Sequence, residues 1–108
     1  MSIPHAKPGE VIDVRPLGSS FPGTKTHTLF KTSKMETLRL VLPQGKTLSE
    51  HKAPGEITIH CLEGEVRFTS LGKTETLHPG TMLYLSAGEP HAVEAVEDSS
   101  ILLTLLLP

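Results

Sequence analysis

Two histidine-containing segments decide the fold of this chain: Gly45-Lys-Thr-Leu-Ser-Glu-His51 and Gly80-Thr-Met-Leu-Tyr-Leu-Ser-Ala-Gly88-Glu-Pro-His91. In each segment the histidine follows a strand-like stretch and a turn that contains glycine. Two more short apolar runs, each with its own turn, lie between the two histidines. This layout predicts that His51 and His91, although forty positions apart, come together inside one small β-barrel.

Outside these segments, short runs of alternating or β-branched residues recur about every ten positions, separated by turn residues. This spacing is typical of an all-β sandwich or barrel. Leu38, Leu40 and Leu42 share one face of a run, which is the period of a strand. No long window shows helical periodicity. We expect strands at Val11–Arg15, Thr24–Lys31, Thr37–Leu42, Ile57–Leu62, Glu65–Ser70, Thr74–Leu77, Thr81–Leu85, His91–Ala95 and Ile101–Leu107.

The length of the chain, 108 residues, allows one core and therefore one domain. The first ten residues combine two prolines with polar residues and no strand pattern. We therefore expect residues 1–10 to form a loosely ordered arm and residues 11–108 to form a single barrel domain.

The charge and composition argue against several classes of partner. The net charge is −2, there is no tryptophan, and no segment combines clustered lysine or arginine with aromatic residues, so we expect no binding to nucleic acid. A basic amphipathic helix that could lie on a membrane is also missing.

The N-terminus has no continuous apolar stretch, and the single cysteine cannot form an intrachain disulfide. These features predict a cytoplasmic protein.

The last expected strand, Ile101–Leu107, is apolar on both faces apart from Thr104. A strand of this kind has its outer face covered as well as its inner face. We expect a second subunit to cover it, in an isologous homodimer. The alternative is that the N-terminal arm folds over that face.

The two histidine segments resemble the paired motifs of the cupin superfamily, G-x5-H-x-H-x3/4-E-x6-G and G-x5-P-x-G-x2-H-x3-N. Gly45 and His51 match the start of the first motif, Gly64 matches its closing glycine, and Gly80 and His91 match the second motif at the same spacing as in the family. The resemblance implies an all-β, double-stranded β-helix (jelly-roll) barrel. It also implies a dimer, and a divalent metal ion (iron, manganese, zinc or nickel) in the mouth of the barrel.

The chain departs from these motifs at two of the four metal-ligand positions. Ala53 stands where the family has the second histidine, and Ile57 stands where it has the glutamate. The proline and the asparagine of the second motif are replaced by Ser86 and Ala95. Of the family's ligands, only the two histidines carry over.

A third metal ligand would have to come from a neighbouring residue, because catalytic zinc normally has three protein ligands and non-haem iron favours two histidines with one carboxylate. The candidates are His60 and its rival Glu56. If Ile57 faces the core, the period of two in a strand points both of them away from it, and a bulge would have to turn either one inward.

The residues are compatible with two functions. In the first, a divalent metal held by His51, His91 and a third ligand serves a small organic substrate, as in a metal-dependent dioxygenase or isomerase. In the second, the barrel is a non-catalytic module that binds or senses a small molecule at a degenerate metal site. The fold alone does not choose between them.

Overall fold

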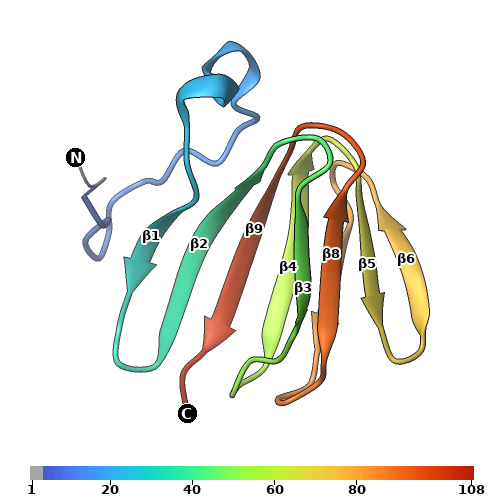
Figure 1. Ribbon diagram of the computed structural model, residues 1–108. Coiled ribbons are helices and arrows are strands. Elements are labelled where there is room, and N and C mark those ends of the chain that lie inside the picture. The colour runs from blue at the N-terminus through green and yellow to red at the C-terminus, as the bar shows by residue number, and fades with distance from the viewer. Residues whose placement is uncertain (1–3) are drawn as a thin grey trace.

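The computed structural model describes residues 4–108, which form nine strands and one short 3-10 helix (Figure 1). The fold is all-β, as the sequence predicts. Among the described residues, no helix is long and apolar enough to cross a membrane. The strands are β1 (His27–Lys31), β2 (Met35–Leu42), β3 (Thr47–His51), β4 (Ile57–Glu63), β5 (Val66–Ser70), β6 (Lys73–Leu77), β7 (Met82–Leu85), β8 (His91–Ala95) and β9 (Ser99–Leu106), and the helix is η1 (Gly18–Gly23).

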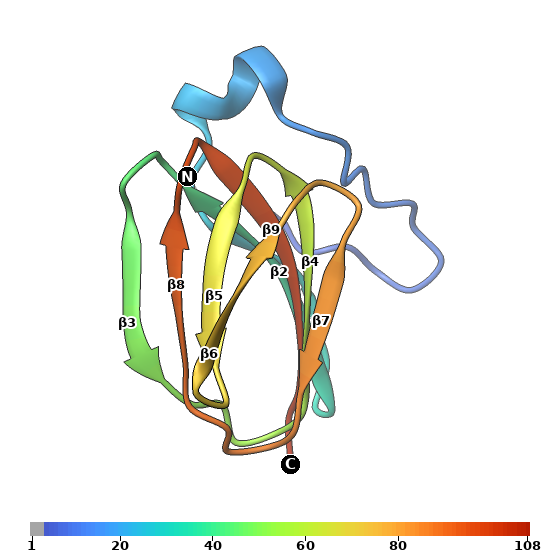
Figure 2. The same ribbon diagram turned by 90° about the vertical axis from the view of Figure 1, so that its right-hand side faces the viewer.

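The strands form two antiparallel sheets, which face each other across the core (Figures 1 and 2). One sheet has the order β1-β2-β9-β4-β7 and the other has the order β3-β8-β5-β6. The strands of each sheet are out of sequence order, because apart from the hairpins β1–β2 and β5–β6 each strand is followed by one in the other sheet. This is the expected jelly-roll barrel. We call one end of the barrel the histidine end: there β3, β5 and β7 finish and β4, β6 and β8 begin (Figure 2).

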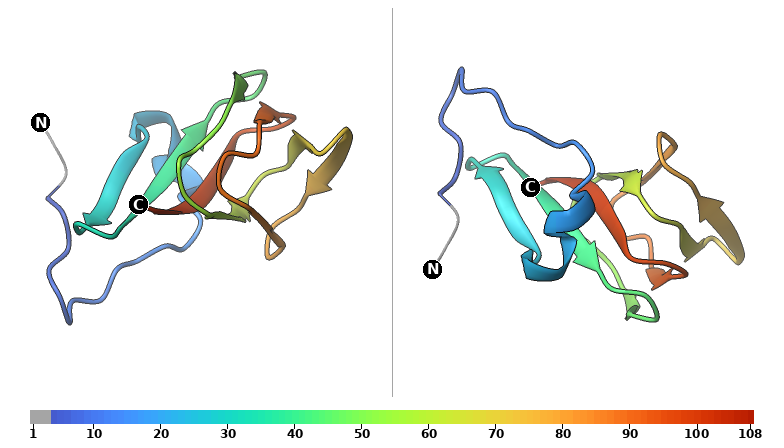
Figure 3. Two further views of the ribbon diagram at one scale, coloured as in Figure 1. Left: turned by 90° about the horizontal axis from the view of Figure 1, so that it is seen from below. Right: turned by 90° about the horizontal axis from the view of Figure 1, so that it is seen from above.

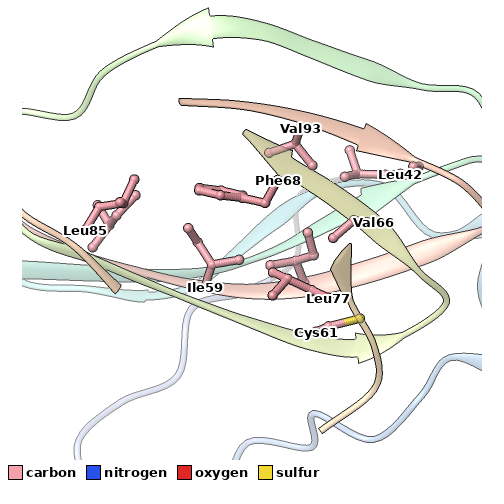
Figure 4. Close-up of a cluster of buried hydrophobic side chains, with 11 residues drawn as sticks. Leu42, Ile59, Cys61, Val66, Phe68, Leu77, Leu85 and Val93 are labelled. Atoms are coloured by element: carbon pink, nitrogen blue, oxygen red, sulfur yellow. The ribbon is translucent and has the colours of Figure 1, made fainter. Parts of the chain in front are cut away.

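The core lies between the sheets, and its side chains alternate most clearly along β4 and β5. On β4, Ile57, Ile59 and Cys61 are buried, and the residues between them are only partly buried. On β5, Val66 and Phe68 are buried and alternate with exposed neighbours. Side chains from both sheets meet in one cluster (Figure 4), so the period of two in the sequence corresponds directly to the inner face.

The N-terminal segment, residues 4–23, runs over the outer face of the five-stranded sheet (Figure 3). Two charged side chains attach it there. Nη2 of Arg39 donates hydrogen bonds of 2.6 Å to the carbonyl oxygens of both Val14 and Arg15. The carboxylate of Glu63 accepts hydrogen bonds of 3.0 Å from the backbone N–H of Leu17. Arg39 is only 4% exposed, and this burial lowers its pKa from the ordinary value.

The expected strand at Val11–Arg15 is wrong: this segment has no strand partner. Its backbone carbonyls bind the Arg39 side chain instead of a neighbouring strand, and its Asp13 pairs locally with Arg15. The expected arm, residues 1–10, is described only from residue 4 onward. There the N–H of Ala6 donates a hydrogen bond of 2.8 Å to the carbonyl oxygen of Leu29 on β1.

The outer face of β9 is covered by the N-terminal segment only on its β2 side. Thr37 and Arg39 are buried there, although they alternate with core residues on β2. On the other side, toward β7, Met82 and Tyr84 are 60% and 70% exposed. The residues that bind Arg39 and Glu63 here are 14, 15 and 17, which lie outside the expected arm 1–10. Both the covering arm and the homodimer stay predictions.

Candidate functional site

Two imidazole rings lie in contact at the histidine end of the barrel. His51 is the last residue of β3 and His91 is the first residue of β8, and these two positions are direct partners in the antiparallel ladder. Directly opposed residues project to the same side of a sheet. The ring centroids are 4.3 Å apart, with an angle of 61° between the ring planes. Strand pairing therefore brings the two motif histidines together.

Each ring is fixed by a main-chain carbonyl two residues earlier in the chain. Nδ1 of His51 lies 2.9 Å from the carbonyl oxygen of Ser49, and Nδ1 of His91 lies 3.0 Å from that of Glu89. A carbonyl oxygen only accepts hydrogen bonds, so Nδ1 carries the proton in both rings. In the neutral form, both Nε2 atoms then have a free lone pair. A metal-binding histidine is typically held in this way, with its other ring nitrogen bonded to a carbonyl or carboxylate.

The two rings differ in their surroundings. His91 is 6% exposed and stacks on Phe68, with ring centroids 5.5 Å apart and 13° between the ring planes. His51 is exposed to solvent. Beside the pair is a small, partly open space of about 20 Å³, which suits an occupant the size of one water molecule or ion. Apart from the two histidines its lining is apolar, namely Leu40, Leu48, Ile59, Phe68, Val93, Ile101 and Leu103.

The structure does not bring a third ligand to this pair. His60 alternates with the buried residues of β4 and pairs with Met82 and Leu102, so it belongs to the outer face of the sheet. Glu56 is exposed in the loop before β4. Ile57, at the family's glutamate position, is buried in the core. Within residues 4–108, no three histidine, cysteine, aspartate or glutamate side chains cluster where they could share a metal ion.

A polar residue that the sequence analysis missed lies beside the pair. Ser70, the last residue of β5, is the direct partner of His91 on the side away from His51. His51 on β3, His91 on β8 and Ser70 on β5 thus form one row across three neighbouring strands. Ser70 is mostly buried and follows the inward alternation of Val66 and Phe68. That alternation is visible in the sequence, but the partnership with His91 depends on strand register.

Cys61 does not contribute a nucleophile to this site. It is fully buried, and its burial raises the pKa of the thiol above the ordinary value. A reactive cysteine needs a lowered pKa and access to solvent. Cys61 therefore acts as a small apolar core residue.

Comparison with known protein families gives one match: the family described as "Cupin domain" covers residues 37–107. This range includes both histidines, seven of the nine strands and most of β2. Among curated protein sequences, none matches the chain.

Several solved structures share the fold. A conserved protein of unknown function, SPY1581 from Streptococcus pyogenes, has a TM-score of 0.78 and 24% identity, covering 100% of this chain and 96% of its own. A cupin superfamily protein, DSY2733 from Desulfitobacterium hafniense DCB-2, has a TM-score of 0.79 and 20% identity, covering 95% and 100%. The DMSP lyase DddQ from Ruegeria pomeroyi DSS-3 has a TM-score of 0.67 and 24% identity, covering 75% of this chain and 45% of its own.

Proposed function

The chain belongs to the cupin family, and on that basis we propose that His51 and His91 bind one divalent metal ion through their Nε2 atoms. In this proposal, a small organic ligand with oxygen donors completes the coordination of the ion. The observation that carries the proposal is the matched hydrogen bonding of the two rings. Both Nδ1 atoms are bonded to main-chain carbonyls, so in the neutral rings both Nε2 atoms keep a lone pair, and the two rings are in contact beside a largely apolar pocket.

The donor set fits a metal that accepts imidazole ligands. Zinc, iron, nickel and copper favour imidazole nitrogen, whereas calcium and magnesium favour oxygen. With two protein ligands instead of three, the ion is held more weakly than in a three-ligand site, and more of its positions are open to ligands. When bound, such an ion would polarise an oxygen of the ligand, which serves isomerisation; oxygenation would in addition need a redox-active ion such as iron and dioxygen as a co-substrate. Because His51 is exposed, a ligand could reach the bound ion from solvent on that side.

Calorimetric titration of metal-free protein with Co²⁺ or Zn²⁺ tests this proposal. We expect one ion per chain, and we expect His51→Ala to weaken its binding by more than the roughly 10- to 100-fold typical of losing a supporting residue. His78→Ala serves as the control, because His78 is exposed in the turn between β6 and β7. Binding should also weaken at acidic pH, since a protonated imidazole cannot bind a metal. Equal affinity in the wild type and His51→Ala would exclude the pair as the metal site.

A second function, binding of a small organic molecule without metal, is supported by the missing third ligand. Ala53 and Ile57 offer no donor, and the pocket is lined almost entirely by apolar side chains. Thermal unfolding in the presence of a strong chelator distinguishes the two functions. Stabilisation by an organic acid or a sugar under these conditions supports the second function. Stabilisation that requires added metal supports the first.

We also propose a homodimer, formed through the uncovered part of the five-stranded sheet. Met82, Tyr84 and Leu106 are exposed there, and methionine and tyrosine are enriched at subunit interfaces. Light scattering should give the mass of a dimer for the wild type and of a monomer for Tyr84→Arg. Leu71→Arg is the control, because Leu71 is exposed in the turn between β5 and β6, outside the five-stranded sheet. A monomeric wild type at high concentration would contradict this proposal.

A further inference from the structure

A second space, much larger than the one beside the histidines, lies between the N-terminal segment and β1. Its volume is about 440 Å³, against about 20 Å³ beside the histidines, and the two spaces share no lining residue. Small-molecule sites typically measure about 300–1,000 Å³. The second space therefore has room for a whole small organic molecule.

This space, which we call the β1 pocket, is lined by residues 6–10 and 12 of the N-terminal segment and by residues 30–32 at the end of β1. A closed turn forms the first wall: the N–H of Glu10 donates a hydrogen bond of 3.0 Å to the carbonyl oxygen of Lys7, and the Glu10 carboxylate accepts one from the N–H of Lys7. The hydrogen bond from Ala6 to Leu29 attaches this turn to β1, at the edge of the five-stranded sheet (Figure 1). The pocket is therefore preformed.

Most of the surface that lines the β1 pocket is apolar. Phe30 and Ile12 contribute to it, and both are half-buried and lie outside the core cluster between the sheets. Their remaining exposed surface can be buried against a ligand, which favours binding. An aromatic ligand suits the pocket, because aromatic rings gain from stacked or edge-to-face contact with a phenylalanine ring.

Two lysines add positive charge to the β1 pocket. Lys7 and Lys31 both line it, and among residues 4–108 neither forms an ion pair with a carboxylate. Glu10, the one acidic residue in the described lining, accepts the hydrogen bond from the N–H of Lys7. The described lining therefore carries a net charge of +1, from two lysines and one glutamate. This charge favours a ligand with an anionic group.

We propose that the β1 pocket binds a small aromatic carboxylate, with its ring against Phe30 and Ile12 and its carboxylate near the ammonium groups of Lys7 and Lys31. A preformed, mostly apolar pocket with a few polar groups that orient the ligand is the usual form of a small-molecule site. This site is separate from the histidine pair and does not depend on a metal ion.

Titration with 2-naphthoate in the presence of a strong chelator tests the proposal. ¹H–¹⁵N correlation spectra should show saturable shifts at the amides of Gly9 and Thr32, with half-saturation on the order of 1 mM, as expected for a small ligand in a half-open pocket. 2-Naphthamide has the same rings without the charge and should bind roughly 2- to 20-fold more weakly, the range for losing two exposed ion pairs. Added salt should reduce this difference.

Four variants separate the proposed contacts from general effects. Lys31→Glu should abolish the preference for 2-naphthoate, and Ile12→Ser should weaken the binding of both probes by roughly three- to tenfold. Lys46→Glu makes the same charge change at an exposed position outside the pocket and should leave both affinities unchanged. His51→Ala should also leave them unchanged, which distinguishes this site from the proposed metal site.

Several results would overturn the inference. They are an absence of saturable shifts, shifts centred on Tyr84 or His91 instead of the β1 pocket, and equal binding of the two probes by the wild type. Unchanged affinities in both Lys31→Glu and Ile12→Ser would do the same. None of these results bears on metal binding by the histidine pair.

Discussion

Phe68→Ala is expected to lower the free energy of unfolding by about 3–5 kcal/mol, the range for removing a fully buried aromatic side chain. Phe68 is 1% exposed and lies in the middle of the core cluster, between the two sheets (Figure 4). Truncation would leave a cavity that the antiparallel sheets on either side cannot easily close. Urea denaturation, followed by a probe of secondary structure, measures the change.

Phe68 also supports the site, because its ring stacks on the His91 imidazole. Phe68→Leu is the matched control: it keeps most of the apolar volume and should cost less than Phe68→Ala, but it removes the aromatic stacking. If the stacking orients His91, both variants should bind Co²⁺ more weakly than the wild type. A loss below about 1 kcal/mol for Phe68→Ala would contradict the core described above.

Gly64→Ala is expected to be comparably destabilising, by about 2–5 kcal/mol, because two penalties add at this position. Gly64 has a φ of 83°, a conformation that disfavours any side chain. A Cβ here would also collide with the carbonyl oxygen of Asp98 and with the hydroxyl of Ser99. Ser99 is the fully buried first residue of β9 and is hydrogen-bonded to the backbone of Glu65, and Asp98 directly precedes it.

Gly45→Ala separates the two penalties. Gly45 has nearly the same φ, 86°, but a Cβ there would have no neighbour within 4 Å. We expect it to cost only the conformational part, about 1–2 kcal/mol. If Gly64→Ala and Gly45→Ala lowered the free energy of unfolding equally, the close approach of Asp98 and Ser99 to Gly64 would contribute nothing to the loss. Both changes are measured by denaturant unfolding under identical conditions.

The inner faces of the strands could be predicted from the sequence, because alternation and burial share the same period. Ile57, Ile59 and Cys61 alternate in the sequence and are buried in the structure. The closing glycine of the first motif was visible as a match to the family. Its physical reason, the close approach of the Asp98–Ser99 backbone, depends on contacts between distant segments.

Two segments could not be predicted from local pattern. Strand β3, Thr47–His51, was not expected, since it is mostly polar and exposed and exists through its pairing with β8. The opposite error occurred at Val11–Arg15, where β-branched residues suggested a strand. This segment is held by hydrogen bonds to one buried side chain, that of Arg39. Contacts to a single side chain produce no periodic pattern in the sequence.

The site could be predicted only in part, for the same reason. The spacing of the motifs indicated that His51 and His91 would meet, and the rings are in contact. The neighbours of the pair follow from strand register, which sequence alone does not determine. Ser70 joins the row because it opposes His91, from the neighbouring strand β5.

The central claim is that both imidazoles carry their proton on Nδ1 and offer Nε2 to a single shared ion. Long-range ¹H–¹⁵N correlation spectra of the histidine side chains, recorded during a titration with Zn²⁺, test it most directly. We predict the Nδ1–H form for both His51 and His91 before zinc is added. The two Nε2 signals should then shift together and saturate at one zinc ion per chain. An Nε2–H form in either ring, or a titration in which only one ring responds, would contradict the claim.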